Sequence, residues 1–465
     1  MGKTLHFLPL IITKLFPPQS NGVGAPWRKP HVMRLLPKAK NLFFLILQKF
    51  LKGVWGKLFS KSFPQHNHTM DYQISDRMKS MKGSAIREIF KYAADPSVIS
   101  LAGGNPAPEL FPNEALADFA AKFLSEQPVL SLQYGVTEGY TPLRDAIRER
   151  LARVEGIGTP DDEVIVVSGG QQGIELATKC LINEGDTVIV EEPSFIGATN
   201  AFRSYNAHLA GVPVEEDGMN LEALERVIAE NKNVKMIYTI PTFQNPMGVT
   251  MSVEKRRALY EIAKKHGILI LEDNPYGELT FDGTKVPTIK SMDTEGIVLY
   301  SGSFSKILAP GLRLGFLCAN KAIIQRVVIG KQISDVHTAM LPQLLAHAYM
   351  TNYDMDALIA QMRANYAHKC HTMLSAMEQY FPADVFYTRP RGGLFIWCDL
   401  GHGLDTGALA KKAVEKKVVF VPGSTFMVNM EQPTSTLRLN YSTMTDEKIV
   451  EGIKRLGEVF SDALK

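Results

Sequence analysis

IVLYSGSFSK, residues 297–306, is the stretch that decides the fold. Its apolar run, IVLY, is continuous rather than alternating, which is typical of a strand buried on both faces of a parallel sheet. Lys306 then lies just past the strand end, close to serines and to Arg313 of the motif GLRLG (311–315). A lysine placed there can form an imine with an aldehyde while the hydroxyls and the second cation hold an anion. Pyridoxal 5′-phosphate carries both groups, and a solvated turn is the alternative interpretation.

A second apolar run, ILIL (268–271), is followed by EDNPYG (272–277). Asp273 would therefore lie at the carboxyl end of a parallel strand, the edge at which open α/β sheets bind ligands. A buried carboxylate that faces a pyridine nitrogen keeps this nitrogen protonated, so the ring can withdraw electrons. Tyr276 could donate a hydrogen bond to the ring's phenolic oxygen. The alternative is an aspartate that opens a turn before Pro275.

Two further apolar runs end in loops that carry polar groups. MIYTI (236–240) is followed by a turn-rich loop that contains Asn245, a side-chain donor. VIVV (164–167) is followed by SGGQQG (168–173) and then by a helical pattern. Glycines at a strand-to-helix turn expose backbone N–H groups at the start of a helix, which suits a phosphate group. Ordinary turn formation is the alternative for both loops.

In this order and at this spacing, the four loops resemble those of the fold-type I pyridoxal-phosphate aminotransferases (class I/II). The similarity is greatest to the subgroup of 2-aminoadipate (kynurenine), lysine-biosynthesis and aromatic aminotransferases, and it runs from about Met70 to the C-terminus. It implies an α/β fold: a large domain with a mostly parallel sheet flanked by helices, and a small α+β C-terminal domain. The implied boundaries are 70–114 for an N-terminal segment, 115–334 for the large cofactor-binding domain, and 335–465 for a connecting helix and the small domain.

The resemblance also implies a role for each motif residue. Lys306 would be the Schiff-base lysine, and Asp273 would be the partner of the pyridine nitrogen. Asn245 and Tyr276 would contact the ring oxygen O3′, which makes Tyr276 the third catalytic residue beside Lys306 and Asp273. The phosphate would be held through backbone amides, hydroxyls and a guanidinium by Gly170, Gln171, Ser303, Ser305 and Arg313.

Two aromatic residues complete the implied cofactor site. Phe195, in EEPSF (191–195), falls where the family places a ring, often tyrosine, that stacks on the pyridine. Losing the hydroxyl leaves the stacking intact. Tyr134, in LQYGVTEG (132–139), matches the tyrosine that reaches the neighbouring subunit's phosphate. It therefore implies a homodimer with shared active sites.

Arg438, in TLRLNYS (436–442), is the residue that the resemblance assigns to the substrate's α-carboxylate. A planar guanidinium makes such a bidentate pair better than lysine does. Holding the carboxylate in the plane of the ring leaves the C–H bond as the one to break, which favours transamination over decarboxylation. From the pattern alone, a surface cation on an edge strand is the alternative.

Side-chain specificity would depend on Arg87. In the subgroup an arginine near this position pairs with a distal carboxylate or swings out for an apolar side chain, whereas the helical pattern that follows Arg87 also suits a plain surface role. Gly104 lies in a glycine-containing loop (100–112) whose backbone can approach a ligand. Phe395 is a candidate for lining the pocket or for the core. The implied substrate residues are Arg438, Arg87, Gly104, Asn245 and Phe395.

The implied activity is ping-pong amino transfer that depends on pyridoxal 5′-phosphate. The donor would be 2-aminoadipate, an aromatic or a branched or aliphatic amino acid, and the acceptor a 2-oxo acid, with 2-oxoglutarate expected. One alternative is another fold-type I enzyme, such as a C–S lyase or a decarboxylase. The other is an aminotransferase-like regulatory protein, although residues 1–69 show no convincing helix-turn-helix pattern. No metal site and no nucleic-acid partner are expected.

Composition agrees with a globular enzyme. The chain has 465 residues, of which 45% are hydrophobic and 21% charged, as expected for a protein with a substantial core. Its four cysteines are far apart and form no disulfide framework or CxxC motif, which fits a cytoplasmic enzyme. Helical patterns are expected at 253–266, 355–381, 406–416 and 446–460, and small-domain strands around Phe395, Phe420 and Leu437.

Residues 1–69 differ from the rest in charge. They hold eleven of the 51 Lys and Arg residues and none of the 48 Asp and Glu residues. Their apolar stretch LFFLIL (42–47) is too short to span a bilayer, so no stable membrane association is expected. A transit peptide, a basic amphipathic segment at 40–61 and sequence upstream of a true start at Met70 are the alternatives. We expect this leader to be poorly ordered.

Overall fold

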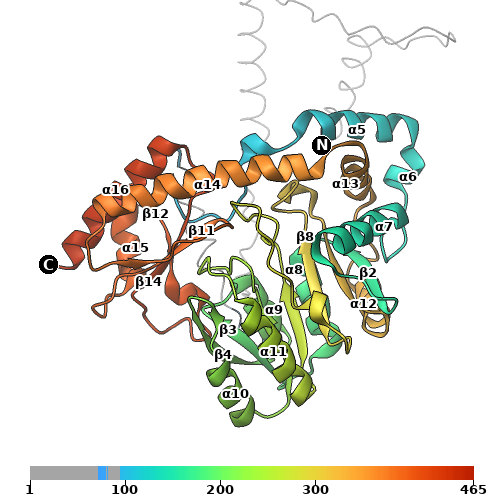
Figure 1. The fold of residues 1–465 in the computed structure, drawn as a ribbon, viewed down its shortest axis with the longest axis horizontal. Helices are drawn as coiled ribbons and strands as arrows, with labels where there is room; N and C mark the ends of the chain where they lie inside the picture. The colour runs from blue at the N-terminus through green and yellow to red at the C-terminus, as the bar shows by residue number, and fades with distance from the viewer. Residues whose placement is uncertain (1–71, 80, 82–94) are drawn as a thin grey trace, which may run out of the picture. The chain divides into compact units, whose positions relative to one another are not determined.

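A large, a small and a two-stranded β-sheet are present in the computed structural model, which describes residues 72–79, 81 and 95–465 (Figure 1). Arg87 and the leader, residues 1–69, lie outside the described residues, so what was predicted for them stays a prediction. From Ile74 onward the chain forms one unit. Within the described ranges, no helix has both the length and the apolar character needed to cross a membrane.

The larger sheet has eight strands, and their order explains where the loops meet. From edge to edge the strands are β2 (Asp162–Val167), β9 (Gly315–Asn320), β8 (Val298–Ser303), β7 (Leu269–Asp273), β6 (Val234–Thr239), β3 (Thr187–Glu192), β4 (His208–Glu215) and β5 (Gly218–Met219). β9 and β5 run antiparallel to their neighbours, and the other pairs are parallel. The carboxyl ends of β2, β3, β6, β7 and β8 therefore lie at one edge.

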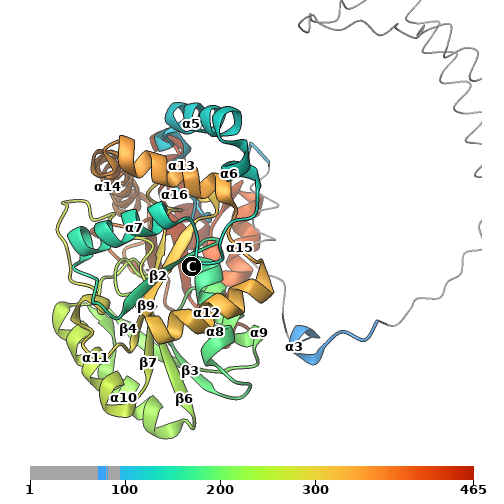
Figure 2. The same ribbon diagram turned by 90° about the vertical axis from the view of Figure 1, so that its right-hand side faces the viewer.

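Both faces of this sheet are covered by helices (Figures 1 and 2). Ile189 of β3 belongs to a core that includes residues of α10 and α11, whereas its neighbours Val188 and Val190 belong to the core shared with α8 and α9. A strand buried on both sides needs apolar residues at consecutive positions, which explains the continuous runs. The predicted α/β fold is confirmed. These helices are α8 (Gly170–Leu181), α9 (Ile196–Ser204), α10 (Leu221–Glu230), α11 (Val253–His266) and α12 (Lys321–Ser334).

Helix α11 illustrates how local sequence sets helix ends. The Ser252 hydroxyl accepts a hydrogen bond from the Lys255 amide at 3.2 Å, which satisfies a free N–H of the first turn. Gly267 ends the helix with φ = +65°, a left-handed conformation that glycine adopts without strain. The helix therefore begins and ends where its sequence pattern predicts.

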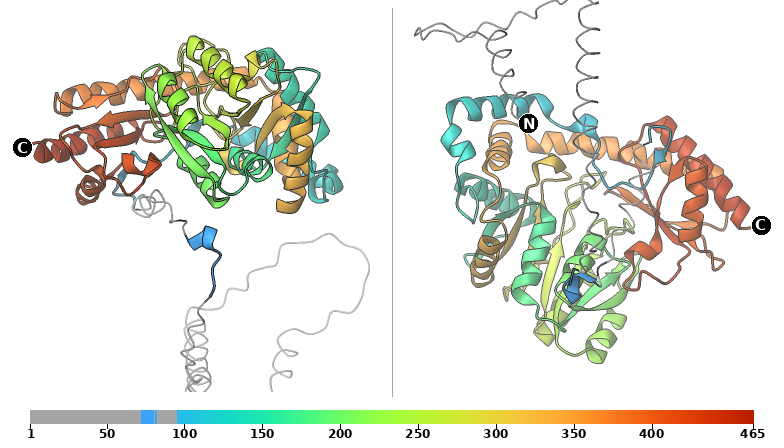
Figure 3. Two further views of the ribbon diagram at one scale, coloured as in Figure 1. Left: turned by 90° about the horizontal axis from the view of Figure 1, so that it is seen from below. Right: turned by 180° about the vertical axis from the view of Figure 1, so that it is seen from behind.

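The smaller sheet contains β10 (Phe386–Tyr387), β11 (Phe395–Asp399), β14 (Thr436–Asn440) and β13 (Val421–Pro422), in that order and antiparallel. The long helix α14 (Met355–Tyr380) leads into it and packs along α16 (Asp446–Ala463) (Figure 3). The strand predicted around Phe420 is instead two short strands. β12 (Val418–Val419) pairs with β1 (Ile99–Ser100), whereas β13 pairs with β14, so the chain changes partner at Phe420.

The other described helices and helical turns lie outside the strands of these sheets. They are α3 (Asp76–Lys79), η1 (Pro108–Leu110), α5 (Asn113–Glu126), α6 (Pro128–Leu132), α7 (Thr141–Arg150), a π-helical turn η2 (Leu151–Glu155), η3 (Lys290–Met292), η4 (Pro310–Leu312), α13 (Met340–Asn352), α15 (Thr406–Glu415) and η5 (Gly423–Phe426).

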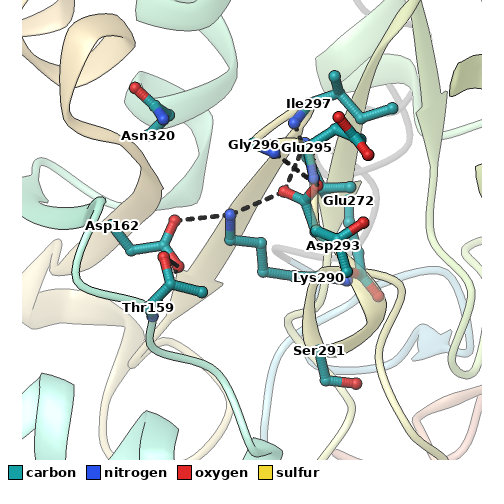
Figure 4. A network of polar contacts seen from close by, with 12 residues as sticks. Thr159, Asp162, Glu272, Lys290, Ser291, Asp293, Glu295, Gly296, Ile297 and Asn320 are labelled. Carbon is teal, nitrogen blue, oxygen red and sulfur yellow. Dashed lines mark hydrogen bonds and ion pairs between the residues drawn. The ribbon is translucent and has the colours of Figure 1, made fainter.

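A buried ion-pair cluster joins the start of β2 to the segment before β8 (Figure 4). The Lys290 ammonium lies 2.7 Å from a carboxylate oxygen of Asp162 and 3.0 Å from one of Asp293. Asp293 also accepts hydrogen bonds from the backbone amides of Gly296 and Val298. Since a buried charge without a partner is strongly destabilising, this cluster fixes the entry of β8, the strand that leads to Lys306.

Arg256 of α11 holds the loop after β6. Its buried guanidinium donates to the carbonyls of Pro241 (2.7 Å), Met251 (2.9 Å) and Pro287 (3.1 Å). Pro241 and Met251 lie at the two ends of the loop that contains Asn245. One side chain therefore closes this loop.

We expect Arg256→Met to lower the free energy of unfolding by about 3 kcal/mol, because several buried carbonyls lose a charged donor. The neighbouring Arg257 is exposed, so Arg257→Met is the matched control and should change stability by less than about 0.5 kcal/mol. Urea denaturation followed by circular dichroism measures both. Equal effects of the two substitutions would contradict the role of Arg256.

Candidate active site

A cavity of about 250 Å³ lies at the carboxyl edge of the large sheet and brings most of the predicted residues together. Those that line it are Gly104, Gly170, Gln171, Phe195, Asn245, Asp273, Tyr276, Ser303, Ser305, Lys306, Arg313, Phe395 and Arg438. Tyr134 does not line it, and its side chain is 80% exposed. Arg87 is outside the described residues. A larger groove of about 860 Å³, between residues 248–253 and 377–391, contains none of the predicted residues.

Lys306 lies past the end of β8, and its amine donates a hydrogen bond to the carbonyl of Gly104. Burial, together with the nearby cations of Arg438 and Arg313, lowers the pKa of Lys306 to about 8. A lysine with such a pKa is partly neutral near neutral pH. It can therefore act as a nucleophile or as a base, which an ordinary surface lysine does poorly.

Asp273 ends β7 and is buried. Burial raises the pKa of its carboxyl to about 6, although the nearby hydroxyls of Tyr238 and Ser301 counteract the shift. The Tyr238 hydroxyl donates to one carboxylate oxygen at 2.9 Å. A cation or a protonated nitrogen that enters the cavity therefore stabilises the ionised form of this carboxylate.

Asn245 connects the predicted ring contacts to the predicted substrate contact. Its side-chain oxygen accepts a hydrogen bond from Arg438 at 2.8 Å. Asn245 also neighbours Tyr276: burial raises the pKa of this tyrosine, and the nearby Arg438 and Asn245 side chains counteract the shift. The two residues predicted to contact the same ring oxygen are therefore adjacent.

Arg438 is buried, which excludes the surface alternative. Its guanidinium carbon lies 4.2 Å from the ring centre of Phe395 and 5.0 Å from that of Phe426, and its Nη2 donates to the Ala102 carbonyl at 2.7 Å. Burial lowers the pKa of Arg438 to about 10. Within the described part of the chain, its Nε has no hydrogen-bond partner. A buried, under-satisfied guanidinium is well suited to a carboxylate.

The Ser168–Gly170 turn forms an anion cradle at the start of α8. Gly169 has φ = +82°, and a Cβ there would lie 2.3 Å from Nη2 of Arg313, so only glycine fits. Arg313 donates to the Ser168 carbonyl at 3.4 Å. The free backbone amides at the helix start and the guanidinium thus share one site, which suits a phosphate.

Sequence reasoning missed two supporting groups. Tyr238, which binds Asp273, lies inside an apolar strand. Glu191 at the end of β3 accepts hydrogen bonds from Ile240 N and Gln244 Nε2, both at 3.1 Å, and so fixes the residue before Asn245. Burial raises the pKa of Glu191. A hydroxyl or a carboxylate inside a buried strand is the signal that could have found them.

These residues fit pyridoxal 5′-phosphate. The lysine amine with a lowered pKa matches the aldehyde, the buried Asp273 carboxylate matches the pyridine nitrogen, and the helix start with Arg313 matches the phosphate. The half-buried ring of Phe195 lies at the start of α9 and lines the same cavity. The set contains the functional groups that the cofactor requires.

Comparisons with known proteins agree with this fit. Residues 97–456 match the family model described as aminotransferase class I and II. The chain is 41% identical over 403 residues to aromatic-amino-acid aminotransferase 1 of Thermococcus litoralis, covering 85% of this chain and 96% of the relative. The crystal structure of Pyrococcus horikoshii kynurenine aminotransferase with PMP is similar with a TM-score of 0.81 at 38% identity, covering 84% and 98%. That of a Thermus thermophilus α-aminoadipate aminotransferase complexed with N-(5′-phosphopyridoxyl)-L-leucine gives 0.78 at 37% identity, also covering 84% and 98%.

We expect Lys306 of the cofactor-free protein to titrate near pH 8. Labelling of lysines with dinitrofluorobenzene between about pH 6 and about pH 11, followed by peptide mass spectrometry, measures this. Only the neutral amine reacts, so labelling of Lys306 should rise through pH 8, well before that of ordinary lysines. Arg438→Gln removes a repelling cation and should move the rise to higher pH. Coincident profiles for Lys306 and surface lysines would contradict the lowered pKa.

Proposed function

The chain belongs to the class I and II aminotransferases and acts with pyridoxal 5′-phosphate, and we propose that it moves the amino group of an aromatic, aliphatic or 2-aminoadipate donor to 2-oxoglutarate. The observation that carries this proposal is one cavity that contains Lys306, Asp273 and Arg438. These provide a base, a counter-charge and a carboxylate partner. These are the groups that the proton transfers of the two half-reactions require.

Each of these residues has a distinct task in the proposed mechanism. When bound, the cofactor withdraws electrons from the substrate α-carbon, so a proton there can be removed. Lys306, which we propose as the covalent attachment site, accepts that proton as a neutral amine. It then returns the proton to the carbon on the other side of the transferred nitrogen. The Gly104 carbonyl gives the released amine a hydrogen-bond partner. Asp273 holds a positive charge on the ring nitrogen.

Arg438 sets the orientation of the substrate. Its Nε and one Nη can bind both oxygens of the α-carboxylate, and the Phe395 ring packed on the guanidinium keeps water away. Asn245, bonded to the same guanidinium, and Tyr276 position the ring oxygen. Phe195 would stack on the ring, while the turn at Gly170 and Gln171, together with Ser303, Ser305 and Arg313, would bind the phosphate.

Relatives support the breadth of donors that we propose. They are named for aromatic amino acids, kynurenine and α-aminoadipate, and one binds a leucine adduct. Among the described residues that line the cavity, the cations are Lys306, Arg313 and Arg438, and each already has a proposed partner. A second carboxylate on glutamate or 2-oxoglutarate needs another cation. We propose Arg87 for this role.

A homodimer with shared sites is part of the proposal. Apolar side chains on and next to α6 and α12 are exposed, namely Val129, Leu132, Tyr134, Val136, Ile329, Ile333 and Val336. The Tyr134 ring contacts that of His337 edge-on at 5.7 Å, so the two segments adjoin. Exposed apolar patches of this kind mark protein interfaces. A partner subunit that covers this patch would receive Tyr134 near its phosphate.

We also propose the domain division 70–114, 115–334 and 335–465, and a cytoplasmic location. The eight-stranded sheet lies within the second range and the four-stranded sheet within the third. Cys318, Cys370 and Cys398 are buried, unpaired thiols. Burial raises their pKa values and keeps them protonated, which suits a reducing compartment.

A donor-by-acceptor panel tests the function. Each amino acid is mixed with a 2-oxo acid, and both products are quantified. Amino transfer yields a new 2-oxo acid and a new amino acid in equal amounts. Release of ammonia without a new amino acid would instead identify a lyase, and release of carbon dioxide a decarboxylase.

Asp273→Asn should keep cofactor binding but lose about a hundredfold in turnover. A two-unit shift in the pKa of the ring nitrogen corresponds to about 2.7 kcal/mol. Tyr238→Phe is the matched control, because it removes one hydrogen bond to Asp273 and leaves the carboxylate in place; its loss should be much smaller. Single-turnover kinetics with leucine measure both. Near wild-type turnover of Asp273→Asn would remove Asp273 from its role.

Arg87→Ala should weaken glutamate, 2-aminoadipate and 2-oxoglutarate by about one to two powers of ten in kcat/KM, because only these have a second anion to bind. Leucine and aromatic donors should be spared. Arg438→Ala should weaken every donor, since all share the α-carboxylate. An equal loss for leucine and 2-aminoadipate on Arg87→Ala would leave the helix-surface interpretation of Arg87 in place.

A further inference from the structure

A second buried ion-pair cluster lies next to the phosphate cradle. The Lys331 side chain, at the end of α12, is fully buried. Its ammonium donates to both carboxylate oxygens of Asp335 at 2.8 and 2.9 Å, and to Gln172 Oε1 at 2.8 Å. Gln172 Nε2 also donates to Asp335 at 2.7 Å. We call Lys331, Asp335 and Gln172 the clamp.

The clamp and Arg313 bind different polar groups of Ser168 in the cradle. Gln172 Oε1 accepts a hydrogen bond from the Ser168 amide at 2.7 Å, and the Ser168 hydroxyl donates to Asp335 at 3.0 Å. The Ser168 carbonyl meanwhile accepts from Arg313. All three polar groups of Ser168 are therefore fixed, and Figure 2 shows α12 beside α8, whose start is the cradle.

The clamp also reaches the exposed apolar patch. Asp335 is followed by Val336, which is half exposed and has φ = +65°, a conformation that β-branched residues rarely adopt. His337 Nε2 accepts from the Gly135 amide at 3.3 Å, so its Nδ1 donates to the Thr338 carbonyl at 2.9 Å. Gly135 directly follows Tyr134. Residues 335–337 thus connect the cradle, through Asp335, to the loop that contains Tyr134, through His337.

We infer that this clamp couples the cofactor's phosphate to the partner subunit, with Lys331 as a positioning residue. The inference rests on the proposed shared-site dimer. A phosphate that orders the cradle orders Ser168 and Asp335, and through them the strained segment at Val336 and the Tyr134 loop that meets the partner. Because coupling between two binding equilibria is reciprocal, the partner tightens phosphate binding by the same factor.

The inference differs from a merely structural role for a buried lysine. Lys290 is also a buried lysine in an ion pair. Its partners are Asp162, at the start of β2, and Asp293, before β8 (Figure 4). The other hydrogen bonds of these two carboxylates go to Thr159, to Tyr260 and to the backbone amides of residues 295–298, and not to the cradle or the Tyr134 loop. Lys290→Met therefore matches Lys331→Met in the loss of a buried cation without touching the coupled segments.

Subunit exchange tests the inference. Two dimer populations with different fluorescent labels are mixed, and the exchange rate is measured without cofactor, with pyridoxal 5′-phosphate and with pyridoxal, which lacks the phosphate. In the wild type, pyridoxal 5′-phosphate should slow exchange by about fivefold or more, in the usual range of coupling between sites. Pyridoxal should slow it much less.

Lys331→Met should abolish most of this difference, and the milder Asp335→Asn should reduce it even if Lys331→Met fails to fold. Lys290→Met should keep the wild-type ratio. If Asp335→Asn and Lys331→Met kept the wild-type ratio of exchange rates with and without pyridoxal 5′-phosphate, the coupling would be overturned. The proposed dimer and the proposed activity would be unaffected by that result. A wild type that sediments as a monomer with cofactor bound would overturn the proposed dimer and the coupling together, and the donor-by-acceptor panel reports separately on the activity.

Discussion

Burial of ionisable groups at one edge of the sheet is the constraint on which the rest of the structure depends. Lys306, Asp273 and Arg438 all line one cavity, and burial shifts each pKa toward the neutral form. The nearby guanidinium groups of Arg438 and Arg313 favour the neutral form of Lys306. Burial leaves the ionised form of Asp273 less stable than that of an exposed carboxylate. An anionic phosphate, a protonated ring nitrogen and a substrate carboxylate are partners that suit such a site. The chemistry of the cavity therefore follows from where its charges are forced to lie.

The residues around the cavity convert this electrostatic arrangement into fixed geometry. Tyr238 orients Asp273, Glu191 fixes the loop before Asn245, and Arg256 closes that loop. Each contact joins a residue of a strand or helix to a residue of another strand or of the loop after β6. Reacting groups that must be placed within a fraction of an ångström are thus supported by rigid elements rather than by the loops that carry them.

Sequence alone predicted what depends on local pattern. Continuous apolar runs gave the strands, and the polar residue just past each run, such as Asp273 or Lys306, was placed at the correct edge because parallel strands share it. Contacts across strands were not predictable, because the Tyr238–Asp273 bond depends on the register of β6 and β7 and on side-chain direction. The break at Phe420 was missed since both halves are apolar and only the choice of partner strand separates them. The exposed position of Tyr134 agrees with its expected role only if a second subunit is present.

The Ser168–Gly170 turn shows why a local motif is not yet a binding site. Its glycines permit the conformation, but its position depends on Arg313 and on Asp335, which lie 145 and 167 residues further along the chain from Ser168. Such a cradle exists only in the folded chain, so a ligand that needs it binds the folded state and not the unfolded one. Ligand binding then stabilises the fold by mass action, by about 2.7 kcal/mol at a free concentration a hundred times the Kd. Phosphate recognition and folding of the large sheet are therefore thermodynamically linked.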